Sequence, residues 1–420
     1  MITSRPSLPY RPLSGWCAAL LLAACSSSTE PRPITQLPRA LTSAEQTLIT
    51  QSNGFAFSLF RAVDDRRPVA DANTFISPLS ASMALGMTMN GAAGSTLDAM
   101  RNTLEFSGMS MADADASYQS LIALLRGLDP SVDFQIANSI WYRQDFPFEQ
   151  SFLQTGQQYF DAKIQGLDFD DPSAPGTINA WVNESTNGKI DKMIDKIDSQ
   201  QVMFLLNAIY FKGSWQAEFD KARTSSQPFF LADGSTTPVE LMHLPHDSVP
   251  AVATADYHAA ELPYGGGAFA MDVVVPTEGK TLDDLIASMD SDAWQALLAS
   301  FTTQTGDVYL PRFQLTWDGS LKDPLTALGM GIAFQGGAAD FTGMSSTRGH
   351  ELYISSVNQK TFVDVNEEGT EAAAVTSVGV SVTAYHEPLI RADRPFLFAI
   401  RERLSGTILF VGAMRRPGGE

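Results

Sequence analysis

The sequence predicts an α+β fold, because it combines patterns typical of amphipathic helices with patterns typical of buried strands. Thr42-Ser43-Ala44-Glu45 has the form of a capping box, and it opens a helix predicted to run to about residue 62. Residues 132–142 alternate and are rich in aromatic and β-branched side chains, as half-buried strands are. Residues 201–212 are almost continuously apolar, which predicts a strand buried on both faces.

The N-terminal 25 residues are expected to be a processing segment that does not belong to the fold. Two arginines precede an apolar run, 16–24, that is too short to span a bilayer. The run ends in Leu22-Ala23-Ala24-Cys25, which resembles the lipobox of bacterial lipoproteins, in which the cysteine carries the lipid. The alternative is a secretory signal in which Cys25 is incidental. Residues 26–41 are polar and contain three prolines, so we expect a flexible linker there.

These features predict a protein outside the cytoplasm, anchored through Cys25 to the cell envelope, in the periplasm or at the cell surface. After processing, Cys25 would be the one remaining cysteine, so the mature chain would have no internal disulfide. The chain has 28 basic and 47 acidic residues and a net charge of −19. Such a surface repels nucleic acids and anionic membranes, so we expect no nucleic-acid partner and no membrane contact except through the lipid.

The other elements follow from local signals. Ser77-Pro78 marks a short strand followed by a helix, because proline is tolerated in a first helical turn. The sequence 187–188, Asn-Gly, is a stop signal for the helix before it. Further helices are predicted over 148–160 and 177–186, a helical pair over 281–301, alternating strands and turns over 228–275, a strand over 355–367 and a closing hairpin over 393–412.

Two apparent chemical sites are better explained structurally. Ser77 lies at a helix start, but no glycine flanks it as a nucleophile elbow requires, so we expect a capping serine. His243 and His246 are separated by Pro245, which prevents a helix from placing both imidazoles on one face. No cluster of thiolates or carboxylates converges on them in the sequence. We therefore expect no metal, no cofactor and no enzymatic activity.

Residues 370–383 can be understood either as a strand or as part of a loop. An acidic stretch and Gly369 precede them, and residues 385–388 have the composition of an exposed loop. As a strand, they would place small or β-branched uncharged side chains on one face. That set is Thr370, Ala372, Ala374, Thr376, Val378, Val380 and Val382.

The acidic stretch carries a family resemblance. Residues 367–374, Glu-Glu-Gly-Thr-Glu-Ala-Ala-Ala, resemble the reactive-loop hinge of the serpins, which trap proteases by inserting a loop into a β-sheet. Four other strings resemble serpin sequences in the same order, at 73–92, 207–215, 308–313 and 393–412. The resemblance implies one domain over 42–417, with three β-sheets, about eight to nine helices and an exposed reactive loop at about 368–388.

The resemblance also implies functional residues. The hinge would be Glu367, Glu368, Gly369, Thr370, Glu371, Ala372, Ala373 and Ala374. The region where the sheet opens would include Ser77, Ser80, Asn207, Trp215, Arg312 and Gln359. Many serpins have a histidine at the position of Gln359, bonded to the asparagine that matches Asn207, and we expect the Gln359 amide to keep this contact. We also expect Arg312 to pair with Glu367.

The implied function is inhibition of endopeptidases, in which the loop inserts after a protease has formed an acyl-enzyme with it. The reactive bond would be Thr383–Ala384, or one residue further on. These small residues favour an elastase- or subtilisin-like serine protease as target; Tyr385 leaves a chymotrypsin-like target open, and a cysteine protease also stays open. Some serpins bind heparin through a basic helix. The helix that matches it here, 111–128, has Arg126 as its one cation, so we expect no heparin binding. We expect a monomer. The alternative is a non-inhibitory serpin that acts as a binding protein or chaperone.

Overall fold

The computed structural model describes residues 1, 33–106, 108–370 and 388–418. Strands and helices are mixed along the chain without a regular alternation. The described part of the chain from Pro33 onward belongs to one compact unit. The predicted processing segment with Cys25 and the reactive bond Thr383–Ala384 lie outside the described residues. So do Glu371, Ala372, Ala373 and Ala374 of the expected hinge.

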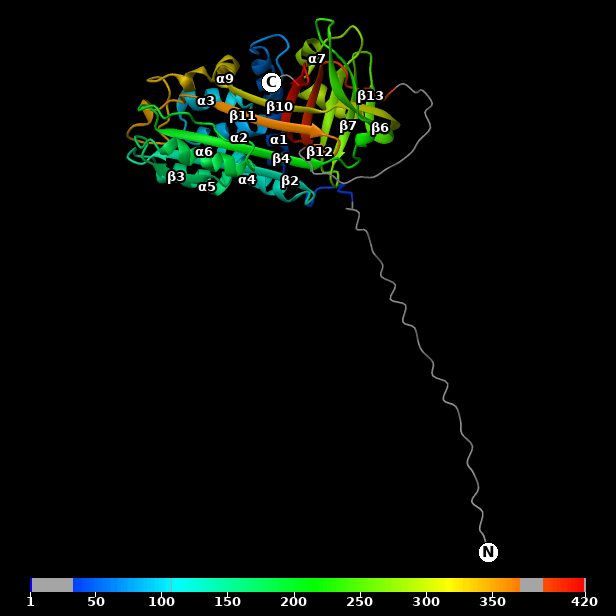
Figure 1. The fold of residues 1–420 in the computed structure, drawn as a ribbon. Coiled ribbons are helices and arrows are strands. Elements are labelled where there is room, and N and C mark those ends of the chain that lie inside the picture. The colour runs from blue at the N-terminus through cyan, green and yellow to red at the C-terminus, as the bar shows by residue number, and fades with distance from the viewer. Residues whose placement is uncertain (2–32, 107, 371–387, 419–420) are drawn as a thin grey trace. The chain divides into compact units, whose positions relative to one another are not determined.

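A six-stranded sheet, which we call the front sheet, contains the hinge. Its strands follow one another across Figure 1, with β12 between β11 and β4. All neighbouring strands are antiparallel except β2 and β3, which are parallel. In spatial order the strands are β10 (Phe313–Ser320), β11 (Asn358–Asn366), β12 (Gly369–Thr370), β4 (Met203–Ser214), β2 (Val132–Arg143) and β3 (Lys163–Leu167).

The remaining strands form a nine-stranded sheet with two parts that share β6 (Thr236–Ala253). The first part of β6 pairs with β5, its last residues pair with β7, and its register with β9 shifts between Leu244 and Asp247. Counted with the front sheet, these two parts give the three sheets that the sequence predicts. The other strands are β1 (Thr74–Ile76), β5 (Ser225–Phe230), β7 (Tyr257–Tyr264), β8 (Phe269–Pro276), β9 (Thr302–Pro311), β13 (Ile390–Arg391), β14 (Phe396–Glu402) and β15 (Ile408–Met414).

The described residues contain nine α-helices, and the predicted capping box opens the first. The Thr42 hydroxyl accepts a hydrogen bond from the Glu45 backbone, and the Glu45 carboxylate accepts one from the Thr42 backbone. None of these helices is long and apolar enough to cross a membrane. They are α1 (Ser43–Asp64), α2 (Pro78–Met89), α3 (Gly94–Thr103), α4 (Met111–Gly127), α5 (Gln150–Phe160), α6 (Ala174–Ser185), α7 (Leu282–Ser288), α8 (Ser291–Ser300) and α9 (Lys322–Leu325).

Helix α2 lies between the two sheets and is buried along almost its whole length. Its apolar side chains point in all directions, as expected for a helix with protein on every side. The Ser77 hydroxyl, at its N-terminus, donates to the carbonyl of Leu409 in β15. The Ser80 hydroxyl donates to the carbonyl of Asn207 in β4. The helix therefore ties the front sheet to the C-terminal strands.

The prediction that β4 is buried on both faces is wrong for one face. Phe204 and Leu206 are buried against α6, in a core cluster of their own. Leu205 and Ile209, on the opposite face, are half-buried. The reason is tertiary, since α6 packs over one face, and along the edge of this part of β4 that faces β11 no strand of the described residues pairs with it.

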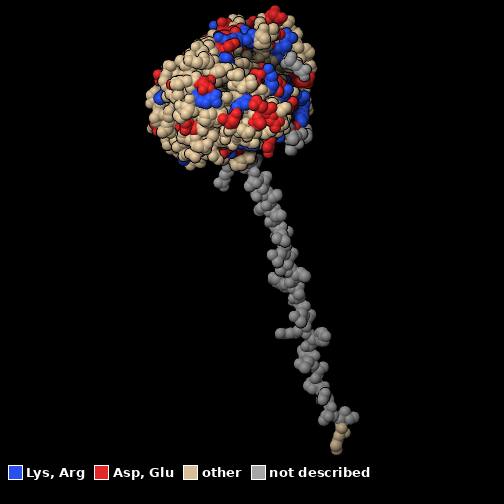
Figure 2. Space-filling model, turned by 90° about the vertical axis from the view of Figure 1, so that its left-hand side faces the viewer, with Lys and Arg blue, Asp and Glu red and all other residues tan. Residues whose placement is uncertain are grey.

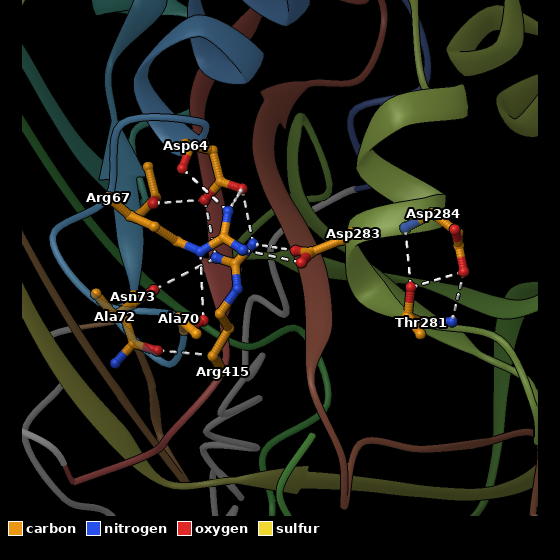
Figure 3. A network of polar contacts seen from close by, with 10 residues as sticks. Asp64, Arg67, Ala70, Ala72, Asn73, Thr281, Asp283, Asp284 and Arg415 are labelled. Carbon is orange, nitrogen blue, oxygen red and sulfur yellow. Dashed lines mark hydrogen bonds and ion pairs between the residues drawn. The ribbon is translucent and has the colours of Figure 1, made fainter. Parts of the chain in front are cut away.

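The end of the last strand is fixed by ionic contacts (Figure 3). Arg415, which follows β15, donates to both carboxylate oxygens of Asp64 at 2.7 and 2.8 Å. It also contacts Asp283 of α7 at 2.7 Å, and Arg67 bridges the same two carboxylates. These four residues, which we call the C-terminal network, join α1, α7 and β15.

The linker expected over 26–41 is packed on the body of the protein from Ile34 onward. The Ile34 N–H donates to the carbonyl of Gly266 at 2.7 Å. Arg39 pairs with Glu45 at 2.5 Å, and Leu37 is partly buried against the core. The prediction rested on the prolines, whereas the apolar side chains between them decide the packing.

Candidate functional site

Among the described residues, the front sheet is not continuous between β11 and β4 beyond Thr370. In the described residues these two strands are joined only through β12, which is two residues long. Thr370 pairs with Val365 of β11 and with Gly213 of β4, and Gly369 pairs with the next residue of each strand. We call the space between β11 and β4 beyond Thr370 the slot.

A cavity of about 490 Å³ lies at the end of the slot that is farther from Thr370. Helix α2 lines it with Ser80 and Ala84, β4 lines it with Leu205 and Asn207, and β11 contributes Gln359. Polar and apolar side chains therefore share the walls of the cavity.

Ser77 has the structural role expected of it. It is the N-cap of α2, and its hydroxyl accepts from the Ser80 N–H at 3.3 Å while donating to the Leu409 carbonyl at 2.8 Å. Both Ser77 and Ser80 are buried, and Ser80 lines the cavity.

The expected contact between Gln359 and Asn207 is not formed. The Gln359 amide instead accepts from the Ser77 N–H at 2.9 Å and donates to the Ser77 carbonyl at 2.8 Å. A primary amide has one acceptor oxygen and N–H donors, so it can bond both the N–H and the C=O of one extended residue. This explains why Gln359 bonds the Ser77 backbone and not Asn207. The side-chain amide N–H of Asn207 donates to the Asn138 side-chain oxygen at 2.5 Å. The side-chain oxygen of Asn207, Oδ1, is buried and has no hydrogen-bond partner in the described structure.

The turn from β11 into β12 consists of Glu367 and Glu368. Gly369 follows with φ of 150°, a region that other residues rarely adopt. A Cβ at Gly369 would lie 2.1 Å from the Gly213 carbonyl oxygen, so only glycine fits this close approach. The predicted hinge glycine therefore lies where the chain reverses.

Thr370 is on the buried face, as the alternation predicts. Its side chain is 2% exposed, and its hydroxyl is 2.7 Å from the hydroxyl of Tyr264. Burial raises the pKa of Tyr264, so this phenol stays protonated. Tyr264 in turn stacks on Trp215, with ring centroids 4.4 Å apart.

The expected ion pair between Arg312 and Glu367 is present. Arg312 donates to the Glu367 carboxylate at 2.5 Å, and the Thr224 hydroxyl donates to the same oxygen at 2.6 Å. Burial raises the pKa of Glu367, but these two hydrogen bonds outweigh it and hold the pKa below the ordinary value. Arg312 is 45% exposed, whereas the Glu367 side chain is 1% exposed.

Several contacts to the turn come from residues that sequence reasoning missed. Lys221 pairs with Glu368 at 2.5 Å, and the Phe219 N–H donates to the Glu367 carbonyl at 2.8 Å. Trp215, which was expected in this region, donates its indole N–H to the Asn366 carbonyl and its backbone N–H to Glu368. No motif marks Lys221, Thr224 or Tyr264, because each acts through a partner more than 100 positions away in the chain.

The histidines considered for a metal site both contact Asp307, at 3.3 Å from His243 and 3.7 Å from His246. Among the described residues, no group of three or more His, Cys, Asp or Glu side chains could hold a metal ion. Figure 2 shows acidic and basic side chains lying next to one another on the face in view.

A family model described as Serpin (serine protease inhibitor) matches residues 50–417. The leukocyte elastase inhibitor of Sus scrofa is 35% identical over 388 residues, covering 89% of this chain and all of the relative. Iripin-2 of Ixodes ricinus is 33% identical over 389 residues, covering 89% of this chain and 94% of the relative.

Solved structures are also similar. The thermophilic serpin tengpin in its native state superposes with a TM-score of 0.79 at 30% identity, covering 92% of this chain and 97% of tengpin. Thyroxine-binding globulin in complex with thyroxine superposes with a TM-score of 0.79 at 27% identity, covering 89% of this chain and all of that one.

Proposed function

The chain belongs to the serpin family, and from this premise we propose that it inhibits endopeptidases by inserting its cleaved reactive loop into the slot of the front sheet. In this mechanism the protein is not an enzyme but a substrate that traps one. The target attacks the loop and forms an acyl-enzyme, and insertion then carries the attached protease away before water can release it.

The observation that carries the proposal is strand β12, whose two described residues lie between β11 and β4. It already pairs with both neighbours, so continuing it requires no new register. Six residues beyond Thr370, position 376 would come opposite Asn207, six residues before Gly213 in β4. The same position would come opposite Gln359, six residues before Val365 in β11.

This register would place Thr376 and Val378 on the inner face, towards the cavity. A threonine hydroxyl at position 376 could supply the donor that the buried Asn207 oxygen lacks. Valines further along would fill apolar space, and each new residue would add main-chain hydrogen bonds to both neighbours. The inserted form should therefore have a lower free energy than the form in which the loop is outside the sheet.

Mixing the protein with a panel of endopeptidases tests the proposal on a denaturing gel. The panel should contain elastase-, subtilisin- and chymotrypsin-like serine proteases and a cysteine protease. We expect a covalent complex that survives denaturation with the elastase- or subtilisin-like enzyme. Mass spectrometry of the released C-terminal peptide should place the cut at Thr383–Ala384. Cleavage without any complex, across the panel, would instead support the non-inhibitory alternative.

The elastase-like preference is also supported by relatives that are named leukocyte elastase inhibitors. We propose that the protein acts as a monomer, that it needs no cofactor, and that its partner is the protease alone. The net charge of −19 does not favour heparin or nucleic acid as additional partners.

We further propose that Cys25 is lipidated and anchors the protein outside the cytoplasm. The support is the lipobox-like string that ends at Cys25. Mass spectrometry of the mature N-terminus tests this, with a lipid-modified Cys25 as the expected first residue. A mature chain that starts at another, unmodified residue would rule the anchor out.

A further inference from the structure

We propose that Lys221 is a positioning residue for loop insertion, because it holds the turn between β11 and β12 in the form from which the strand can grow. This inference rests on the proposed function and extends it to a residue outside the hinge. Lys221 is the first residue of the short 3-10 helix η1 (Lys221–Arg223), which lies in the segment 215–224 after β4.

The segment 215–224, which we call the cradle, holds the main chain of the turn. The Trp215 N–H donates to the Glu368 carbonyl, and the Phe219 N–H donates to the Glu367 carbonyl, each at 2.8 Å. The Trp215 indole donates to the Asn366 carbonyl at 2.9 Å. The cradle thus satisfies three successive carbonyls that would otherwise lack partners at a buried chain reversal.

The side chains of the turn depend on cations at the surface. The Glu368 side chain is 7% exposed, whereas the Lys221 side chain that contacts it at 2.5 Å is 58% exposed. The start of η1 is fixed in turn by Asp220, whose carboxylate accepts from the Ala222 N–H at 2.9 Å. Lys221 is therefore presented to Glu368 by a capped element and not by a free loop.

Loss of Lys221 would have an asymmetric effect. An exposed lysine without its partner remains hydrated, but a buried carboxylate without its cation must move out to water or take up a proton. Glu368 can move out only if the backbone of the turn moves with it. Since Gly369 and Thr370 directly follow, their pairing with β11 and β4 would be weakened.

The direction of the effect follows from where the turn lies. Two residue pairs of the growing strand are already formed beyond it, so the observed turn is the one that an inserted strand would keep. Contacts that hold it favour insertion. The bond that the protease attacks, near Thr383, is thirteen residues beyond Thr370 in the sequence, so Lys221 should not affect acylation.

The test compares Lys221→Ala with wild type by titrating the protease that wild type traps. We expect the ratio of cleaved to trapped inhibitor, obtained from the stoichiometry of inhibition, to rise by about two- to fivefold, as for the loss of an ion pair with one exposed partner. The rate at which the loop is first cleaved should not change. A general loss of stability would raise the stoichiometry as well, but it would also change the rate of cleavage, so an unchanged rate identifies positioning. Lys221→Arg should restore wild-type behaviour.

Lys280→Ala is the matched control, because Lys280 pairs with exposed Asp256 at 2.7 Å and loses the same charge. Glu368→Gln replaces the buried carboxylate by a neutral amide that needs no cation. The double variant Lys221→Ala, Glu368→Gln should therefore trap the protease better than Lys221→Ala alone. Unchanged stoichiometry in Lys221→Ala, or an equal rise in Lys280→Ala, would overturn the inference.

A second measurement does not need any protease. Hydrogen exchange of the Trp215 and Phe219 amides should be faster in Lys221→Ala than in wild type and in Lys280→Ala, since both amides donate to the turn. Unchanged exchange overturns the inference even if wild type traps a protease. Faster exchange in a protein that traps none supports the hold on the turn and contradicts the proposed function instead.

Discussion

The C-terminal strands and the slot differ in how far neighbouring strands are paired among the residues that the structure describes. Strand β15 pairs with β1 on one side and β14 on the other, and β14 pairs again with β8. Every residue of β14 and β15 is buried. At the slot, β12 pairs two residues on each side, and a cavity follows. Within the described residues, the molecule therefore combines a fully paired set of C-terminal strands with a front sheet in which β11 and β4 are paired through two residues.

The ionic contacts of the two regions differ in how exposed their charged side chains are. In the C-terminal network, Arg415 and Asp64 are both at most 5% exposed. At the hinge, the buried carboxylates of Glu367 and Glu368 are matched by cations that are about half exposed. Water can compete for the hinge pairs but not for Arg415 and Asp64. The hinge contacts can thus be exchanged during a conformational change, whereas the C-terminal network fixes one structure.

The largest expected effect is produced by Thr370→Arg, which blocks the slot at its entrance. A guanidinium at this buried position would lie unpaired beside Tyr264, so insertion should stop while cleavage near Thr383 continues. The variant should change from inhibitor to substrate, with no persistent complex on a denaturing gel. Glu371→Arg is the control, because the alternation places residue 371 on the outer face. Equal loss in both variants would contradict the facing pattern.

Cutting the loop near Thr383 should raise thermal stability, because the freed strand can complete the front sheet. We expect an increase in Tm of roughly 10 °C or more, since each kcal/mol moves Tm by a few degrees in a domain of this size. An ordinary nicked loop would leave Tm unchanged or lower it. Calorimetry before and after nicking measures the difference, and a constant Tm would favour a non-inhibitory protein.

Arg415→Met should destabilise the folded state strongly, because the buried Asp64 carboxylate would lose its bidentate cation and keep only Arg67 and the Thr74 hydroxyl as side-chain partners among the described residues. We expect a loss of about 3 kcal/mol in the free energy of unfolding, as for other broken buried pairs. Denaturant unfolding measures it. Arg67→Met removes the more exposed arginine and should cost less. A loss below about 1 kcal/mol for Arg415→Met would mean that the network does not stabilise the C-terminal strands.

The helices behind the slot contain a carboxyl group without a cation. Burial raises the pKa of Asp115 in α4 from 3.8 to about 6, and a hydrogen bond from Asn90 only partly offsets this. A folded pKa above the unfolded one means that Asp115 destabilises the protein at pH 7 and that this cost falls as the pH drops towards 5.

Asp115→Asn should therefore stabilise the protein at pH 7 and lose that advantage near pH 5, measured as Tm at the two pH values. The exposed Asp98 is the matched position, where the same substitution should leave the pH dependence of Tm unchanged. If the Tm of wild type and of Asp115→Asn changed equally between the two pH values, Asp115 would not titrate in this range.

The smallest expected effect is that of reversing the hinge pair. Because Arg312 is partly exposed, we expect the pair to contribute well under about 1 kcal/mol. Arg312→Glu or Glu367→Arg alone should increase aggregation on heating, and the double reversal should restore wild-type behaviour. A double variant as prone to aggregation as the single ones would show that the pairing itself does not matter.

Much of the fold is evident from local pattern. The capping box at Thr42 starts α1 where the sequence predicts, and Ser77 caps α2 as expected. The alternation around Thr370 assigns it to the buried face, where the structure places it. These properties depend on residues a few positions apart, because helix capping and strand alternation are set by the backbone geometry of one element.

Other features were decided only by the tertiary structure. Gln359 binds the backbone of Ser77, 282 positions away, and not Asn207. Lys221 reaches Glu368 across 147 positions, and the two faces of β4 are buried unequally because α6 packs against one of them. The sequence specifies which groups need partners, since burial without one is costly. Which partner each group meets depends on how whole elements pack, and that is a property of the assembled fold.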